Sequence, residues 1–126
     1  MNLNQVTLPS TDIRRSVAFC RGMGFRLIVE SEDYARFECP AGESTFSVHK
    51  LVDIKPGSDT IIYFESDELD QLFLDLTNEG YAFEYAPRDE PWLWRETRLK
   101  DPDGNMICLF CAGVNRKHPP WRVIDA

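Results

Sequence analysis

The chain repeats one pattern of strand and helix signals at an offset of 56 residues. Residues 4–25 read NQVTLPSTDIRRSVAFCRGMGF, and residues 60–81 read TIIYFESDELDQLFLDLTNEGY. The alignment places Asp12 on Glu68, Gly24 on Gly80 and Phe25 on Tyr81. Because a repeat of this length corresponds to one supersecondary unit, the chain is predicted to contain two copies of the same unit.

Each copy opens with a short strand pattern, at residues 5–8 and 60–64. Polar residues that can cap a helix follow, Ser10-Thr11-Asp12 in the first copy and Ser66-Asp67 in the second. Apolar side chains then recur at helical spacing until Gly24 or Gly80, where glycine tolerates the left-handed conformation that ends many helices. Three strand patterns complete each copy, at residues 25–31, 34–40 and 44–50 in the first and at 81–87, 94–100 and 105–111 in the second.

A turn and a tail complete this organisation. Asp101-Pro-Asp-Gly-Asn105 is a strong turn signal between the last two strand patterns, because proline restricts φ and glycine accepts positive φ. Residues 113–126 are polar and proline-containing, so we expect an irregular tail. We interpret residues 1–126 as a single domain with modules at 4–55 and 60–112.

Charge and composition narrow the possible partners. Lys and Arg number 14 against 21 Asp and Glu, so the net charge is −7, which disfavours binding to nucleic acid. No apolar run approaches the roughly 18 residues that a membrane helix needs, and the N-terminus does not resemble a signal peptide. The four cysteines do not suggest a disulfide framework. We therefore expect a cytoplasmic protein with reduced cysteines and no membrane partner.

Three segments carry a resemblance to a known family: residues 12–25 (DIRRSVAFCRGMGF), 64–70 (FESDELD) and 94–110 (WRETRLKDPDGNMICLF). They resemble the vicinal oxygen chelate superfamily of glyoxalase I, extradiol dioxygenases, fosfomycin-resistance enzymes and bleomycin-resistance proteins. The DPDGN turn is the most specific piece, and the likeness covers about residues 4–111. It implies an α+β fold of two tandem βαβββ modules, whose sheets form an eight-stranded U-shaped cup with the helices outside.

The resemblance also implies where a metal would bind. Metal-using members place a common His, His and Glu set on the first strand of each module and on a last strand. These positions correspond here to Gln5, Ile61 and Cys108, a set poorly suited to a divalent ion, so we expect no metal cofactor. His49, near the end of the fourth strand pattern, is the alternative ligand, and its direction is left open.

A ligand-binding signal lies in Pro91-Trp92-Leu93-Trp94-Arg95. If this segment is extended, both indoles lie on one face, where they can stack on a planar ligand. Arg95 can then bind a carboxylate. Strand alternation adds further candidate ligand-binding residues that would line the cup: Gln5, Thr7, Tyr63, Cys108 and Phe110.

Cys108 and Cys111 read as a CxxC motif, but in a strand they point to opposite faces and cannot easily share a metal or a disulfide. Cys108 would act as a nucleophile only if a nearby cation or helix start lowered its pKa. The sequence shows neither, so a buried apolar cysteine is the favoured interpretation.

Three functions remain open. The first is a protein that has lost the usual metal ligands and binds a small organic molecule in its cup, without a cofactor. The second is a divergent metal-dependent lyase or dioxygenase, so enzymatic activity is undecided. The third is a non-catalytic interaction protein, against which the tryptophans and arginine of residues 92–95 favour the first. We expect a homodimer in each case, because superfamily members usually pair and an open cup leaves strand edges to cover.

Overall fold

The computed structural model describes residues 1–53 and 59–124. The chain divides into two compact units, one made of residues 1–59 and 101–105 and the other of residues 60–100 and 106–126. The predicted end of the first module, at residue 55, and the last two residues of the predicted tail lie outside the described residues.

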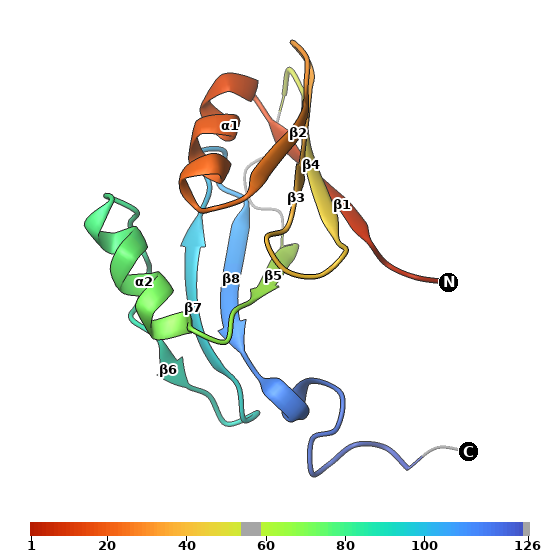
Figure 1. Cartoon of the computed structure of the whole chain (residues 1–126), viewed down its shortest axis with the longest axis vertical. Coiled ribbons are helices and arrows are strands. Elements are labelled where there is room, and N and C mark those ends of the chain that lie inside the picture. Colours follow the sequence, from red (N-terminus) through yellow and green to blue (C-terminus); the bar gives the residue numbers. More distant parts are fainter. Residues whose placement is uncertain (54–58, 125–126) are drawn as a thin grey trace. The chain divides into compact units, whose positions relative to one another are not determined.

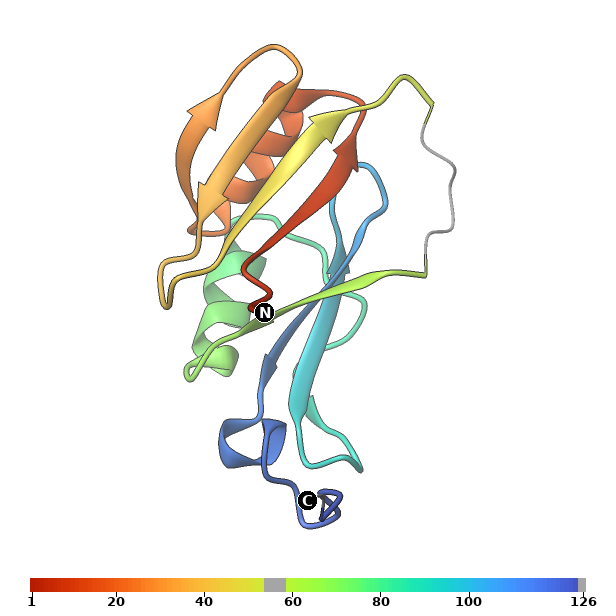
Figure 2. The same ribbon diagram turned by 90° about the vertical axis from the view of Figure 1, so that its right-hand side faces the viewer.

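The first unit is a βαβββ module (Figure 1). Its sheet has the order β1-β4-β3-β2, in which β1 and β4 are parallel and the other neighbours are antiparallel. Figure 2 shows α1 on one face of this sheet, behind the strands. The elements are β1 (Gln5–Ser10), α1 (Ile13–Gly22), β2 (Arg26–Glu30), β3 (Tyr34–Glu38) and β4 (Thr45–Lys50).

The second unit repeats this topology with the sheet order β5-β8-β7-β6, and β5 and β8 are again the parallel pair. The predicted α+β fold of two βαβββ modules is therefore confirmed, while the joining of both sheets into one cup stays a prediction. A short 3₁₀ helix, η1 (Gly113–Arg116), begins the tail. The elements are β5 (Ile61–Glu65), α2 (Leu69–Asn78), β6 (Arg88–Asp89), β7 (Arg95–Lys100) and β8 (Met106–Cys111).

Each unit has an apolar core in which alternate strand residues meet one face of a helix. Helix α1 buries Ile13, Val17 and Cys20, the three positions that the helical spacing predicts. Helix α2 buries Leu69 and Leu76. The α-helices α1 and α2 have ten residues each, and no helix in the described part of the chain is long and apolar enough to span a membrane. The sheets contribute Leu8, Ala35, Phe37, Phe46 and Val48 in the first unit and Leu99, Ile107 and Leu109 in the second.

The two helices begin differently. The Asp12 carboxylate accepts a hydrogen bond from the Arg15 backbone N–H at 3.1 Å, so it caps α1 as predicted. Helix α2 begins after Glu68, whose side chain makes no capping hydrogen bond. Ser66 accepts a bond from the Glu68 backbone N–H at 3.2 Å. Of the two predicted capping residues of α2, only Ser66 therefore makes a bond at the helix start.

Both helices end as the repeat predicts. Gly24 and Gly80 follow the last helical turn with φ of +104° and +102°. A residue with a side chain is strained at such angles, so glycine is required at both positions.

The prediction of a strand over residues 81–87 is wrong. The structure has one isolated bridge there, between Phe83 and Leu99, and the strand β6 covers only Arg88–Asp89. Pro87 lacks the N–H that would continue the ladder. The Phe83 ring instead packs against Phe73 of α2, with centroids 4.9 Å apart.

The DPDGN turn packs within the first unit. The Asp103 side chain, only 3% exposed, accepts hydrogen bonds from the Thr11 backbone N–H at 3.1 Å and from Arg15 Nη2 at 2.9 Å. The Asn105 amide donates to the Pro9 carbonyl at 3.0 Å. The turn therefore secures the start of α1 in addition to reversing the chain.

Candidate functional site

An aromatic cluster lies on one face of the second sheet. The rings of Trp94 and Phe110 stack with centroids 4.5 Å apart, and Tyr63 meets them edge-on at 5.9 Å and 5.7 Å. Ile61 and Trp94 also pack against buried Cys108 and Phe110. The structure thus brings together four predicted ligand-binding residues, Tyr63, Trp94, Cys108 and Phe110. Ile61, which the resemblance aligns with a metal position of the family, lies beside them.

Strand register explains this grouping. Tyr63 of β5 pairs with Cys108 of β8, which pairs with Arg98 of β7. Residues paired across a ladder point to the same face, so these three side chains form one row. Phe110, two residues along β8, pairs with Glu96 and begins the next row on that face.

Glu96 lies beside the aromatic cluster and is 1% exposed. Its carboxylate accepts hydrogen bonds from Arg98 Nε at 3.1 Å, Tyr85 OH at 3.3 Å and Trp92 Nε1 at 3.1 Å. The Cys108 thiol donates to it at 3.3 Å. A buried carboxylate needs such partners, because an unpaired charge away from water is strongly unfavourable.

Glu96, Arg98 and Tyr85 are absent from the residues predicted for the site. A signal for two of them exists in WRETRLK, where Trp94, Glu96 and Arg98 alternate along one strand. Alternation places them on one face, so an acid and a base follow the indole on the same side. Tyr85 has no comparable signal, because the segment before β6 is irregular.

The tryptophan segment is a turn and not the extended strand that the prediction required. Leu93 has a φ of +67°, a left-handed conformation that changes the chain direction between the two indoles. Pro91 favours a turn at this point. Trp92 consequently hydrogen-bonds Glu96, whereas Trp94 stacks in the aromatic cluster.

Arg95 lies on the other face of β7 from Glu96, because neighbouring strand residues alternate. Its guanidinium binds Asp70 of α2 at 3.0 Å and Asp89 at 3.1 Å, and these hydrogen bonds raise the pKa of Arg95. The expected pairing of Arg95 with the indoles is therefore not found. Arg95 instead lines an open hollow of about 410 Å³ with Cys111 and the residues at the start of α2.

Cys108 is fully buried. Burial, followed by the hydrogen bond and charge of Glu96, raises the pKa of its thiol to about 12. At neutral pH it is a protonated donor to Glu96 and not a nucleophile. Cys111 lies on the opposite face, and both are free thiols, so the predicted divergence of the CxxC pair is confirmed.

The first sheet carries the remaining predicted residues on a polar face. Gln5 Oε1 accepts a hydrogen bond from Thr45 Oγ1 at 2.8 Å, and the hydroxyls of Thr7 and Ser47 are 2.7 Å apart. His49 is exposed and shares the parity of Ser47, which settles the direction that the sequence left open.

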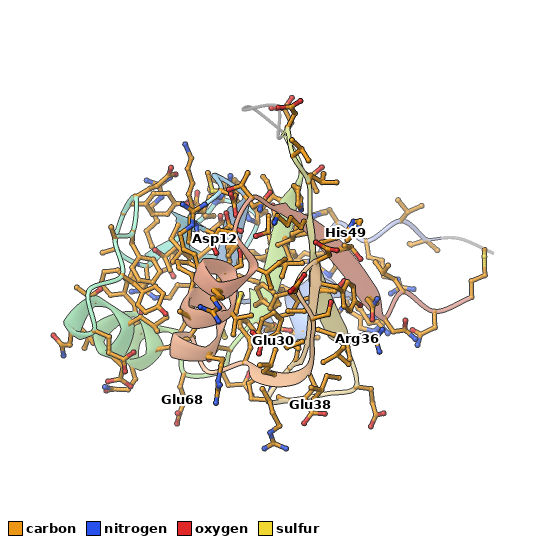
Figure 3. All side chains as sticks on the ribbon, turned by 90° about the horizontal axis from the view of Figure 1, so that it is seen from above. Asp12, Glu30, Arg36, Glu38, His49 and Glu68 are labelled. Atoms are coloured by element: carbon orange, nitrogen blue, oxygen red, sulfur yellow. The ribbon has the colours of Figure 1, made fainter. Side chains whose placement is uncertain are left out.

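Tyr34 and Arg36 lie on this polar face as well. They pair with His49 and Ser47 across the β3–β4 ladder, and Figure 3 shows Arg36 and His49 on the side of the sheet away from α1. Arg36 Nε donates to the Tyr34 hydroxyl at 2.9 Å. Hydrogen bonds from Ser47 and Arg36 lower the pKa of Tyr34.

The three residues predicted to occupy the family's metal positions, Gln5, Ile61 and Cys108, are poor ligands for a divalent ion. The Gln5 amide oxygen already accepts a hydrogen bond, and Ile61 has no donor atom. Cys108 is a protonated thiol directed at Glu96. Within residues 1–53 and 59–124, no three or more His, Cys, Asp or Glu side chains form a group that could hold a metal. The lack of a metal cofactor stays a prediction.

Several solved structures share this fold. A bleomycin resistance determinant encoded on the transposon Tn5 has a TM-score of 0.77 and 19% identity, covering 90% of this chain and 99% of that one. A glyoxalase/bleomycin resistance protein/dioxygenase from Nocardioides has a TM-score of 0.75 and 21% identity, covering 89% and 83%. A bleomycin-binding protein complexed with bleomycin has a TM-score of 0.73 and 20% identity, covering 88% and 98%.

Sequence comparison supplies the assignment to a family. No curated protein sequence matches the chain. Residues 2–109, however, match the family described as the Glyoxalase/Bleomycin resistance protein/Dioxygenase superfamily. That match covers most of the chain, including both βαβββ modules up to the last strand. The chain therefore belongs to the Glyoxalase/Bleomycin resistance protein/Dioxygenase superfamily.

Proposed function

We propose that the protein binds a small organic molecule with a planar aromatic part. Its contact surface is the aromatic face, defined as Tyr63, Trp94 and Phe110. The ring stacking at this face is the observation that carries the proposal. Tyr63 is 43% exposed while Phe110 is 4% exposed, so buried rings hold an accessible one in place.

The aromatic face can supply only part of the free energy of binding. Stacking on an aromatic ring adds about 0.5–1.5 kcal/mol beyond the burial of apolar surface. Micromolar affinity corresponds to about −8 kcal/mol, so the ligand must also lose water and gain polar contacts. The aromatic face therefore orients the ligand, and other groups supply the rest of the affinity.

Binding without chemical conversion is the favoured form of this function. The Cys108 thiol beside the aromatic face is protonated, and the family's metal positions lack suitable donors. The similar fold of a bleomycin-binding protein solved with bleomycin supports the same interpretation. A divergent lyase or dioxygenase would need a ligand set that Gln5, Ile61 and Cys108 do not supply.

We extend the proposal to a cytoplasmic homodimer. Strands β1 and β5 lie at the edges of their sheets, where backbone groups can pair with a second chain. Sedimentation at micromolar concentration should show a dimer, and a monomer alone would reject this part. Cell fractionation tests the location.

The binding test uses nuclear magnetic resonance of the tryptophan indole N–H groups. The whole protein is titrated with bleomycin and with a panel of aromatic acids and amides. At least one compound should shift the Trp94 signal, and Tyr63→Ala should weaken its binding about tenfold, equivalent to the upper end of a stacking contribution. Trp121→Phe, in the tail, is the control and should leave binding unchanged.

Two outcomes would change the proposal. If no compound shifts the Trp94 signal, the interaction-protein function is favoured instead. If a bound compound is converted to a product after incubation with divalent metal, the protein is an enzyme. Chromatography of the recovered compound distinguishes conversion from binding.

A further inference from the structure

We infer that the ligand carries an anionic group, a carboxylate or its equivalent, and that Arg98 binds this group while Glu96 holds Arg98 in position. This inference rests on the proposed function, because it places the anionic group beside the aromatic face. It names the chemical class of the ligand as a planar aromatic acid.

The Arg98 side chain has donors to spare. It is 26% exposed and uses Nε to bind Glu96 at 3.1 Å. Its guanidinium also interacts with the Cys108 thiol. Within the described residues, no carboxylate other than Glu96 forms an ion pair with Arg98. A guanidinium fixed through Nε presents the Nη donors in a set direction, which suits two-point recognition of a carboxylate.

Glu96 is the wrong partner for a cationic ligand. Its side chain is 2% exposed, and Arg98, Tyr85, Trp92 and Cys108 already donate to its two oxygens. A positive ligand group would have to displace these donors and leave Arg98 unpaired, at a high desolvation cost. An anionic group only has to replace water around the Nη groups.

The groups around Arg98 keep its guanidinium positively charged and add no further negative charge beside it. Burial lowers the pKa of Arg98, but the hydrogen bond and charge of Glu96 outweigh it and hold the pKa above its usual value. The pKa of Tyr85 is raised by burial and by Glu96. Tyr85 and Cys108 therefore stay neutral donors, and neither adds a negative charge that would repel the ligand's acid group.

The pairing of the strands sets the distance between Tyr63 and Arg98 across the sheet. Tyr63 and Arg98 both pair with Cys108 from opposite sides, so their strands are separated by about 10 Å, two strand spacings. The short Cys108 side chain lies between these two long ones. A molecule with a ring on Tyr63 can therefore reach Arg98 with an acid group attached directly or through a short link.

The test compares matched acids and amides on the whole protein. The probes are 2-naphthoate with 2-naphthamide and indole-3-acetate with indole-3-acetamide. For at least one pair, the acid should bind about ten- to a hundredfold more tightly than its amide, the range expected for a charge-assisted hydrogen bond. The acid should also shift the Arg98 Nε resonance, while the amide shifts only the indole signals.

Two arginine variants locate the effect. Arg98→Lys should keep the fold, checked by circular dichroism, and remove most of the preference for the acid because lysine lacks the planar fork. Arg95→Met removes a guanidinium from the other face and should leave the preference unchanged.

The possible failures are distinguishable. Equal binding of acid and amide in the unaltered protein would overturn the role of Arg98 but leave the aromatic face as a binding surface. A preference that is lost in Arg95→Met and kept in Arg98→Lys would assign recognition to Arg95 and overturn the inference. If neither probe of any pair binds, both the inference and its basis in the proposed function are rejected.

Discussion

The two βαβββ modules share a topology but present different sheet faces. In the first, β1, β3 and β4 display hydroxyl, amide and guanidinium groups, with Thr7 and Ser47 in hydrogen-bond contact. In the second, the corresponding strands display the aromatic face and a buried carboxylate, Glu96. The strand order is nevertheless the same in both sheets.

This contrast shows which features of a duplicated fold can diverge. The topology depends on where strands, helices and glycine turns occur, and these positions are repeated. The face of each sheet that lies away from its helix depends on every second strand residue, and these residues can change without affecting the core on the helix side. One backbone pattern therefore supports two chemically different surfaces.

The largest effect is expected at Glu96. Glu96→Ala leaves the half-buried Arg98 guanidinium without a carboxylate and removes the acceptor of the Tyr85, Trp92 and Cys108 hydrogen bonds, so the free energy of unfolding should fall by about 3–5 kcal/mol. Urea unfolding measures this change. Glu84→Ala, at an exposed position, is the matched control and should change stability by less than about 0.5 kcal/mol. A small effect of Glu96→Ala would contradict this expectation. It would mean that the buried carboxylate of the second module does not make its sheet face more important for stability than the polar face of the first module.

Asp103 should show the next largest effect, in the first unit. Asp103→Ala removes the acceptor of the Thr11 and Arg15 hydrogen bonds, and we expect a loss of about 2–3 kcal/mol in urea unfolding. Asp33→Ala, an exposed aspartate, serves as the control. If both variants unfold at the same urea concentration, the DPDGN turn does not secure α1.

The helix starts allow a comparison at equivalent positions of the repeat. Asp12→Ala should destabilise the protein by about 1 kcal/mol, because it removes the cap of α1. Glu68→Ala should have almost no effect, since Glu68 makes no capping hydrogen bond. Equal losses for the two variants, measured by thermal unfolding, would show that the helix starts are equivalent after all.

The smallest expected effect is the contribution of Asp103 to the change in the free energy of unfolding at acidic pH. Burial favours the protonated form of Asp103, but hydrogen bonds from Thr11 and the charge of Arg15 outweigh it and lower its pKa. A carboxyl with a lowered folded-state pKa stabilises the protein above the unfolded-state value of about 4, and this contribution is lost as the pH falls through the folded-state pKa.

Asp103→Asn removes that contribution, so its stability should fall less than that of the unaltered protein between pH 6 and pH 3. Urea unfolding at each pH measures the difference. Parallel loss in both proteins would show that Asp103 does not titrate differently in the folded state.

Most of the fold could be predicted because its signals are local. Ile13, Val17 and Cys20 show the helical period of α1 over a few residues, and Gly24 and Gly80 mark both helix ends. The wrong prediction of a strand at residues 81–87 has a local cause as well, since Pro87 interrupts the segment and lacks the N–H that a strand ladder needs.

The candidate site could be predicted only in part. Alternation grouped Tyr63, Cys108 and Phe110 correctly, because residues two apart on a strand share a face. Alternation wrongly placed Trp92 and Trp94 on one face, because Leu93 adopts a left-handed conformation that could not be predicted from the sequence. Their ligand-binding roles stay predictions.

The sequence by itself determined the duplication, which a comparison of two segments 56 residues apart reveals without any structure. It also determined the order of strands and helices and the two glycine turns, since these follow from residues close together in the chain. The tertiary structure decided which charged groups meet. Glu96 and Cys108 are 12 residues apart, and Arg15 and Asp103 are 88 apart. Such pairs depend on strand register and on where a turn packs, so they become visible only when distant segments are placed side by side.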